Sequence, residues 1–336
     1  MTMKKVKTAI VGLGFIGMSH LKGHLESPNI ELRALVDVNK ELGEKLSSRH
    51  NVRYYQTIDD LLQNEDVDMV DVCIPTWLHE DCIIKAAQKK KHVLCEKPLT
   101  FTLESFERIA KAVDDSNVRF MVAQVIRFWP EYVRIKELYN KGEFGPIKLA
   151  SARRISEVPN WSSWYKDPNK SGGALFDLML HDLDYFVYLF GEPKSVYAAG
   201  KQSETGCWDY VQANIRFEND INAAVESSNA AFGHFPFTMG FFLFGSDMIA
   251  NYELKAGHNI DTIGKRDLFT YTESSGEVRQ KVEEYDPYAF EINYFADCII
   301  NNKPCDIVSM ESSRQTLKLA LAVKKSLETK SPVELK

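Results

Sequence analysis

The chain has 336 residues, of which 44% are hydrophobic and 26% charged, and its formal net charge is −6. This length favours two domains over a single hydrophobic core, and the composition is that of an ordinary globular protein. The net negative charge excludes non-specific electrostatic binding to nucleic acid. No apolar run reaches the roughly 18 residues of a membrane-spanning helix. We therefore predict neither a nucleic-acid nor a membrane partner.

Six cysteines are scattered along the chain without a CxxC pair, and several of them lie in apolar stretches that resemble strands. This distribution predicts buried free thiols rather than disulfides or zinc ligands. The N-terminal stretch runs from a few basic residues directly into an expected strand, without the apolar region and cleavage site of a signal peptide. We therefore predict a reduced, cytoplasmic protein.

The first expected strand covers residues 6–11, VKTAIV, which are mostly β-branched or apolar. The sequence GLGFIG follows, and its Gly12, Gly14 and Gly17 have the G-x-G-x-x-G spacing of a dinucleotide-binding turn. In such a turn the first glycine permits a tight bend, the second allows the backbone to approach a pyrophosphate, and the third allows close packing of helix and strand. The N-terminus of the following helix offers N–H groups to the phosphates.

A second expected strand, residues 30–38, ends near Asp37, which lies 20 residues beyond Gly17 (37 − 17 = 20). An acid in this position can accept hydrogen bonds from the ribose diol of NAD. The same acid would repel the 2′-phosphate of NADP, and the residues after it offer only Lys40 as a nearby cation. The sequence therefore predicts NAD as the cofactor in preference to NADP.

The alternation of strands and helices continues, with strands expected at 69–74 and 119–127 and helices at 80–91 and 103–116. This pattern predicts a doubly wound parallel sheet, which binds ligands at the carboxyl ends of its strands. Several polar or turn-forming residues follow expected strands and are predicted to face one crevice: Asp37, Pro75, Thr76, Glu96, Lys97, Pro98 and Arg127.

The pattern changes after about residue 126. A helix at 131–141 leads to a turn, a strand and a series of short strands separated by turn signals, and two helices at 287–302 and 309–328 close the chain. The further strands are expected at 194–201, 208–217, 221–230, 237–244, 247–254, 267–272 and 278–283. The predicted fold is thus an α/β Rossmann domain with a doubly wound parallel sheet (1–125), followed by an α+β domain for substrate binding and oligomerisation with a large, mostly antiparallel sheet (126–336).

One face of that second sheet must be covered, and helices could cover only one of its two sides. Its other face would then form a subunit interface, which predicts a homodimer or homotetramer assembled through the C-terminal sheet.

Four stretches resemble the glucose-fructose oxidoreductase / inositol dehydrogenase / rhizopine catabolism family of NAD(P)-dependent dehydrogenases: AIVGLGFIGMSH, IPTWLHEDCIIKAAQKKKHVLCEKPLT, RFWPEYVRIKELYNKGEFGPI and GGALFDLMLHDLDYFVYLFGEP. The resemblance covers nearly the whole chain in the right order. The E-K-P turn and the D-x-x-x-H-D helix are its most specific elements. The family diverges in the loops that contact the substrate, so the resemblance names no substrate.

The resemblance implies that Gly12, Gly14, Phe15 and Ile16 line the pyrophosphate turn and that Asp37 holds the adenosine ribose. It further implies cofactor contacts from Pro75, Thr76, Leu78 and His79, and an approach of Glu96 and Lys97 to the nicotinamide, with a Lys97–Pro98 bond that is commonly cis. Asp177 and His181 match the carboxylate and histidine that join Lys97 in catalysis. The chain departs from many members in having Ser171 where they have the first of three glycines.

The chemistry of alcohol oxidation leads to the same three residues. Such a reaction transfers a hydride to nicotinamide and a proton to a base, and histidine, with an ordinary pKa of about 6.5, is suited to be that base. Asp177 precedes His181 by four residues and shares its helix face, so it could orient the ring or bind substrate hydroxyls. Asp184 could support His181 from behind, and Lys97 would stabilise the developing alkoxide. Hydride transfer needs no metal, and we predict none here.

A stretch rich in arginine and aromatic residues, 153–173, precedes this helix. It supplies candidate substrate contacts, namely Arg154, Trp161, Trp164 and Tyr165. Only one of the adjacent Arg153 and Arg154 can enter a cleft, because neighbouring residues of a strand point to opposite faces. The tryptophans could equally pack a lid onto the domain. Arg127, at the end of the first domain, is expected to contact the cofactor or the substrate.

These patterns together predict an NAD-dependent dehydrogenase that oxidises a secondary hydroxyl of a sugar, inositol or related polyol, with His181 as base and Lys97 polarising the oxygen. Two alternatives remain open at this point. One is an NAD-binding metabolite sensor without turnover, and the other is a glycosidase of the same fold that uses NAD transiently.

Overall fold

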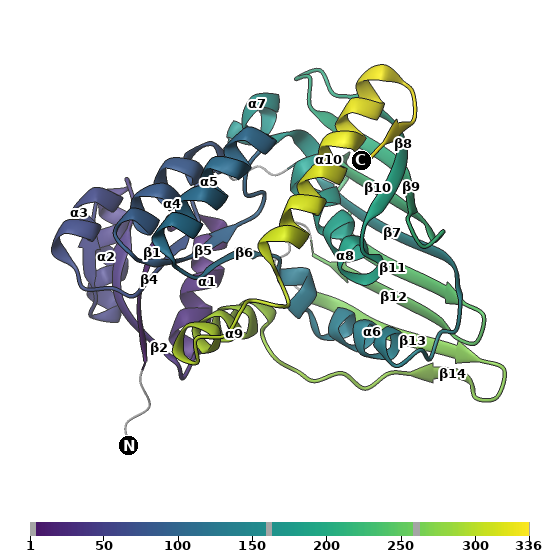
Figure 1. Cartoon of the computed structure of the whole chain (residues 1–336), viewed down its shortest axis with the longest axis horizontal. Helices are drawn as coiled ribbons and strands as arrows, with labels where there is room; N and C mark the ends of the chain where they lie inside the picture. Colours follow the sequence, from purple (N-terminus) through teal and green to yellow (C-terminus); the bar gives the residue numbers. More distant parts are fainter. Residues whose placement is uncertain (1–4, 159–162, 258–262, 336) are drawn as a thin grey trace. The chain divides into compact units, whose positions relative to one another are not determined.

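The computed structural model describes residues 5–158, 163–257 and 263–335 (Figure 1). They form two compact units, and the chain passes between these units more than once. Unit 1 comprises Met1–Phe128 and Tyr285–Ser313, and unit 2 comprises Trp129–Glu284 and Arg314–Lys336.

Unit 1 contains a six-stranded parallel sheet in the order β3-β2-β1-β4-β5-β6. The strands are β1 (Val6–Val11), β2 (Ile30–Val36), β3 (Arg53–Tyr55), β4 (Met69–Val72), β5 (His92–Glu96) and β6 (Phe120–Ala123). The helices between them are α1 (Phe15–Glu26), α2 (Lys40–His50), α3 (Ile58–Asn64), η1 (Thr76–Leu78), α4 (His79–Gln88) and α5 (Leu103–Ser116), with η2 (Val125–Phe128) at the end. This is the predicted doubly wound sheet, with all strands ending at the same edge.

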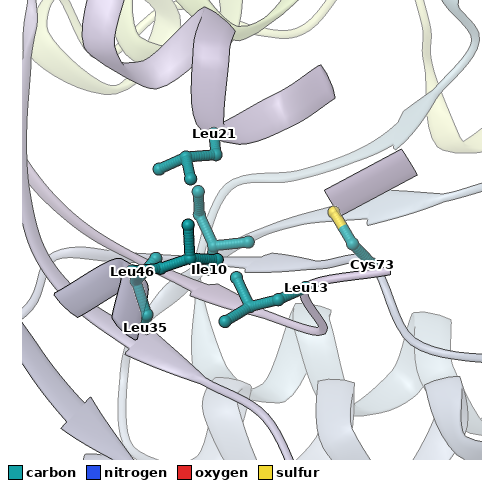
Figure 2. Packing of buried hydrophobic residues seen from close by; sticks show 6 residues of the cluster. All are labelled: Ile10, Leu13, Leu21, Leu35, Leu46 and Cys73. Atoms are coloured by element: carbon teal, nitrogen blue, oxygen red, sulfur yellow. The ribbon is translucent and has the colours of Figure 1, made fainter. Parts of the chain in front are cut away.

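Buried apolar side chains hold the glycine turn of unit 1 in place. A core cluster joins β1, the turn, α1, β2, α2 and the end of β4, and Figure 2 shows its members Ile10, Leu13, Leu21, Leu35, Leu46 and Cys73. Leu13 lies inside the turn and is only 1% exposed. Burial of a leucine side chain contributes about 1.5–3 kcal/mol, so the turn is anchored by packing as well as by its glycines.

Helix α9 (Pro287–Ile300) packs against α1 and η2 and therefore belongs to unit 1. Gly23 of α1 allows this approach, because a Cβ there would lie 2.7 Å from Ile292 Cδ1. The buried face of α9 includes Phe295 and Ala296. The predicted division at 125/126 thus lies close to the first crossing between the units, but residues 285–313 return to unit 1. The apolar face of this returning segment packs against α1 and η2, which are far away from it in the sequence.

Unit 2 contains a nine-stranded sheet in the order β14-β13-β12-β11-β7-β10-β9-β8-β15, and among its described residues only the β7–β10 pair is parallel. Its strands are β7 (Ile147–Glu157), β8 (Pro193–Gln202), β9 (Trp208–Phe217), β10 (Asn222–Ala231), β11 (Phe237–Gly245), β12 (Ile249–Ala256), β13 (Ile263–Thr272), β14 (Gly276–Arg279) and β15 (Val333–Glu334). The predicted large, mostly antiparallel sheet is confirmed.

Helices α6 (Pro130–Asn140), α8 (Leu180–Phe190) and most of α10 (Met310–Thr329) cover one face of this sheet (Figure 1). Side chains that point to the helices are buried, as in the alternating pattern of β9. On the opposite face Arg153, Tyr210 and Lys255 are exposed. Two short helices, η3 (Ser163–Lys166) and α7 (Pro168–Ser171), and the π-helical turn η4 (Leu175–Met179) connect β7 to α8.

The cysteine prediction is confirmed, since all six cysteines are free thiols and five of them are buried. Across the described ranges, no helix combines the length and the apolar character that crossing a membrane requires.

Candidate active site

The glycine turn after β1 has the geometry of a phosphate cradle. Gly12 has φ +99°, and a Cβ there would lie 2.6 Å from the carbonyl oxygen of Cys73. A Cβ at Gly17 would collide with the carbonyl oxygen of Gly12. A Cβ at Gly14 would meet no protein atom within 4 Å, and no side chain caps the N-terminus of α1. The first and third glycines are thus required by the protein itself, whereas the second keeps space open in front of a helix N-terminus, as a pyrophosphate requires.

We expect Gly14→Ala to raise the dissociation constant of NAD by at least about tenfold, because its methyl group would occupy the space of the pyrophosphate. The melting temperature without NAD should fall by only a few degrees, since the methyl group meets no protein atom and alanine is a poorer N-cap than glycine by about 1 kcal/mol or less. Calorimetric titration with NAD measures the dissociation constant, and thermal unfolding of the free protein measures the melting temperature. Unchanged affinity would show that the cofactor does not approach Gly14.

Asp37, after β2, is held by backbone groups. Its Oδ2 accepts the Leu13 N–H at 2.7 Å and its Oδ1 accepts the Asn39 N–H at 2.7 Å. The side chain is half-buried. The carboxylate is therefore fixed beside the glycine turn, where the adenosine ribose was predicted.

The segment after β4 contains four of the predicted cofactor contacts. Pro75 is half-buried, Thr76 is 9% exposed and Leu78 is 46% exposed. His79 differs from the prediction, because its ring is buried and faces two backbone carbonyls, Ile74 O at 2.8 Å from Nε2 and Leu99 O at 3.2 Å from Nδ1. Burial lowers the pKa of this ring. The His79 side chain thus holds the loops after β4 and β5 together and is not available to a cofactor.

Exposed apolar side chains lie next to the glycine turn and in the segment after β4. Phe15 is 50% exposed and Trp77 41% exposed. Ile16 is half-buried and packs against the core cluster of Figure 2. Apolar groups left in water at the carboxyl edge of a parallel sheet are suited to contact with a ligand.

Glu96 and Lys97 follow at the carboxyl end of β5. Glu96 is 5% exposed, and its Oε2 accepts the backbone N–H of Lys97 at 2.8 Å. The Lys97 side chain is half-buried, and the Lys97–Pro98 peptide bond is cis, as the resemblance implied. The side chain of Glu96 is therefore engaged with its own chain, and Lys97 directly follows it at the carboxyl edge of the sheet.

Arg127 does not lie where it was predicted. It is 3% exposed, and its Nη1 donates to Ile307 O at 2.6 Å and to Ser312 Oγ at 3.1 Å. These partners belong to the segment that returns to unit 1. Arg127 thus anchors that segment instead of contacting the cofactor.

Asp177 and His181 lie one turn apart in unit 2. Asp177 belongs to the π-helical turn η4, which packs on β7, β9 and β10, and His181 lies in the first turn of α8. Both side chains are half-buried, whereas most of their neighbours in these two turns are buried. The helix is thus predicted correctly, but its first turn is wider than an α-helix, a deviation that occurs often at functional sites.

The turn that enters this helix explains why Ser171 can replace a glycine. Gly172 and Gly173 both have positive φ, and a Cβ at Gly173 would lie 2.8 Å from the backbone N of Trp208. Ser171 is buried, and its hydroxyl donates to Tyr165 O at 2.8 Å and accepts the Gly173 N–H at 3.1 Å. The serine therefore fixes the entry turn by hydrogen bonds, while the two glycines supply the backbone conformation.

The other two acidic residues of this helix are buried and bind partners in the core of unit 2. Asp184 is fully buried and accepts the Thr316 hydroxyl of α10 at 3.0 Å, so it does not share the predicted stripe with His181. Asp182 forms a buried ion pair with Arg154, with N···O distances of 2.8 and 3.2 Å. Arg154 is 3% exposed and was predicted to contact substrate. Its guanidinium is instead committed to the core, and Arg153 takes the opposite face and pairs with Glu253.

Two of the predicted aromatic contacts lie in η3. Trp164 and Tyr165 are half-buried, and their rings stack on one another with centroids 4.0 Å apart. Trp161, the third aromatic residue, lies outside the described residues.

One polar cluster of unit 1 was not predicted from the sequence. Asp71 lies within the buried strand β4, and His20 and His24 lie one turn apart on α1. A signal was present in the sequence, because an aspartate within the apolar run MVDVCI requires buried partners.

Comparison with known sequences agrees with this geometry. Residues 6–124 match the family described as "Oxidoreductase family, NAD-binding Rossmann fold", and residues 132–249 match the "GFO/IDH/MocA C-terminal domain". The chain belongs to the GFO/IDH/MocA family. It is thus an oxidoreductase of the NAD(P)-dependent class that acts on CH–OH groups, and its first unit is an NAD-binding Rossmann domain.

Relatives in the GFO/IDH/MocA family include an uncharacterized oxidoreductase, YrbE, of Bacillus subtilis, which is 32% identical over 68% of both chains. The scyllo-inositol 2-dehydrogenase (NAD(+)) of the same organism is 27% identical over 98% of this chain and 96% of its own. A crystal structure of scyllo-inositol dehydrogenase from Lactobacillus casei with bound NAD(H) and scyllo-inositol shares the fold, with a TM-score of 0.82, 23% identity and coverage of 98% and 99%.

Proposed function

We propose that this protein is an NAD-dependent dehydrogenase that oxidises a secondary hydroxyl of a sugar, inositol or related polyol. One observation carries the proposal: an NAD-binding domain presents Lys97 at the carboxyl end of β5, and the same chain presents Asp177 and His181 one turn apart on a half-buried helix face. A relative over nearly the full length carries the name scyllo-inositol 2-dehydrogenase, which supports a polyol as substrate.

In the proposed reaction, bound NAD supplies the hydride acceptor, and the side chains of this chain handle the proton and the charge. His181 takes the proton of the substrate hydroxyl, because a neutral imidazole nitrogen is a base suited to neutral pH. The Lys97 ammonium stabilises the negative charge that develops on the hydroxyl oxygen as the C–H bond breaks. Asp177 either orients His181 or binds a neighbouring hydroxyl. The products are the ketone, NADH and one proton.

The residues proposed to hold NAD are those whose geometry suits a bound dinucleotide, namely Gly12, Gly14, Phe15, Ile16, Gly17, Asp37, Pro75, Thr76 and Leu78, with Lys97 near the reacting end. Glu96 takes part through the backbone of Lys97, which its Oε2 fixes. Trp164 and Tyr165 stay candidates for contact with the substrate.

Asp37 is proposed to select NAD over NADP. The variant Asp37→Asn keeps the size of the side chain and one oxygen acceptor but removes the charge that opposes a 2′-phosphate. We expect its preference for NAD, measured as the ratio of kcat/KM values with the two cofactors, to fall by at least about tenfold, or about 1.4 kcal/mol. A wild-type enzyme that prefers NADP, or an unchanged ratio in the variant, would contradict this role.

We propose that the face of the nine-stranded sheet opposite its helices joins two or four copies of the chain. Large apolar side chains are exposed on that face, among them Leu149, Tyr197 and Tyr210. Light scattering should then give a mass of two or four times 38.4 kDa. A mass of one chain at all concentrations would contradict the proposal.

The experiment that tests the proposed function is a screen of polyols, sugars and sugar acids with NAD or NADP, followed by the absorbance of the reduced nicotinamide. A polyol that gives NADH at a rate proportional to enzyme supports the proposal. Tight NAD binding without turnover on any compound would favour a metabolite sensor. Release of a leaving group from a glycoside without net NADH would favour the glycosidase.

A further inference from the structure

A carboxylate lies within the central sheet of unit 1. Asp71 belongs to β4, between β1 and β5, and is 0% exposed. Its Oδ2 lies 2.8 Å from His20 Nδ1 and 2.8 Å from His24 Nε2, and its Oδ1 lies 3.6 Å from Cys73 Sγ. Burying a charge in this way is unfavourable unless partners compensate it, so these donors make the position of Asp71 possible.

His20 joins this carboxylate to a second one. While its Nδ1 donates to Asp71, its Nε2 lies 3.1 Å from Glu96 Oε1. Both ring nitrogens face carboxylate oxygens, an arrangement that favours protons on both nitrogens and hence a cationic ring. Burial alone would lower the pKa of His20, but the charge and hydrogen bond of Asp71, together with the contributions of Cys73, outweigh burial, and the pKa lies well above its usual value. The ring is 0% exposed and packs against Tyr288 of α9, with ring centroids 5.8 Å apart.

Glu96 extends the chain of contacts to Lys97. Its Oε1 faces His20, and its Oε2 accepts the backbone N–H of Lys97 at 2.8 Å. A continuous path therefore leads from Asp71 in β4 through His20 in α1 and Glu96 in β5 to the backbone of Lys97. Charge-assisted hydrogen bonds of this kind are stronger and more directional than neutral ones.

We propose that His20, held as a cation by Asp71, is a positioning residue that orients Glu96 and thereby fixes the backbone from which the Lys97 side chain projects. The kinetic consequence rests on the proposed function, in which Lys97 stabilises the alkoxide. Support from a fixed second layer of side chains is a general requirement for catalytic groups, which tolerate displacements of only about 0.5 Å.

The same side chains have the chemistry of metal ligands, since atoms of His20, Asp71 and Cys73 lie within 4.8 Å of one another. Positioning explains them better than a metal site. Both nitrogens of His20 already face carboxylates, and a metal would have to displace a proton from a ring whose pKa is raised.

His24 provides a matched control on the same helix. It lies one turn after His20 and shares the same oxygen of Asp71, but its Nδ1 lies 2.9 Å from the Thr8 hydroxyl oxygen instead of facing Glu96. Both histidines are buried, at 0% and 2% exposure. A role that is only structural predicts similar effects of the two residues, whereas the proposed path runs through His20 alone.

The test compares His20→Gln with His24→Gln in the full chain. Amide exchange at Lys97, followed by NMR without substrate, should become at least about tenfold faster in His20→Gln and change less than about twofold in His24→Gln. With a substrate found by the screen, kcat of His20→Gln should fall at least about tenfold while KM and the NAD dissociation constant change less than about threefold. Equal effects of the two variants on the Lys97 amide, or no effect of His20→Gln, would overturn the proposal.

A second measurement covers the case in which His20→Gln does not fold. In the wild-type protein, the ¹⁵N shifts of the His20 ring should show both nitrogens protonated at about pH 7.5, where an ordinary histidine is largely neutral. A neutral ring would overturn the proposal. Neither the amide nor the ring measurement uses turnover, so a failure of the positioning role is distinguished from a failure of the proposed dehydrogenase activity.

Discussion

Replacing Lys97 with alanine should lower kcat by about 10²–10³-fold, because the transition state loses the cation that stabilises the developing alkoxide. Binding of NAD should change less than about threefold, since the glycine turn and Asp37 are unaffected by the substitution. Steady-state rates with the best polyol of the screen and calorimetric titration with NAD measure the two effects.

The control for this variant is Lys89→Ala, which removes an exposed lysine after α4 and should leave both values within about twofold.

Replacing His181 with asparagine should lower kcat by about 10²–10⁴-fold through loss of the base. Normal turnover of both the Lys97 and His181 variants would contradict the assignment. For Asp177→Asn, a rise in KM alone would indicate contact with the substrate, and a fall in kcat would indicate orientation of His181.

Removing one partner of the Arg154–Asp182 pair should destabilise unit 2 by about 3–5 kcal/mol. Arg154 is 3% exposed and Asp182 1% exposed, and the two form a bidentate pair, so Arg154→Met leaves a buried carboxylate without its cation. The double variant with Asp182→Leu should recover at least half of the loss, because it removes the uncompensated charge. Denaturant unfolding followed by tryptophan fluorescence measures this, since four of the five tryptophans belong to unit 2.

The neighbouring Arg153 serves as the control, since it pairs with Glu253 on the exposed face of the same strand. Arg153→Met should cost no more than about 1 kcal/mol, as is usual for exposed ion pairs.

The stability loss of Arg154→Met should depend on pH. Burial raises the pKa of Asp182, and the Arg154 charge opposes this. In Arg154→Met only burial acts on Asp182, so the pKa of this carboxyl rises further in the folded state. The loss of folding stability should therefore be smallest below the ordinary carboxyl pKa of about 3.9, where Asp182 is neutral in both states, and should grow as the pH rises and the buried carboxyl must ionise. Equal losses for the two arginine variants would contradict the core role of Arg154.

Local pattern predicted much of the fold. The observed bounds of β1, β9 and α5 match the expected 6–11, 208–217 and 103–116, because each has a clear period and a turn signal or cap at its ends. The strand expected at 119–127 was too long: β6 ends at Ala123, and the apolar residues that follow form η2. A short apolar run does not by itself distinguish a buried strand from a buried helical turn.

The positions of the glycine turn, Asp37 and Lys97 at the ends of β1, β2 and β5 were predictable because they depend on strand pattern and sequence spacing, which are local. Arg127 and Arg154 were misplaced for the opposite reason. Their partners are Ile307 and Asp182, which are 180 and 28 residues away, and nothing near either arginine in the sequence reveals them. The same limit hid the contacts of Asp71 with α1, although its position in an apolar strand showed that it needed partners.

The most direct test of the proposed chemistry follows the hydride itself. Polyols carrying deuterium on the carbon of the reacting hydroxyl are incubated with the wild-type protein and NAD, and the reduced cofactor is analysed by mass spectrometry. The proposal predicts NADH that is heavier by one deuterium, formed by the wild-type protein and reduced at least about 100-fold in rate in the Lys97→Ala variant. Absence of deuterium from the cofactor with every polyol, sugar and sugar acid would contradict it.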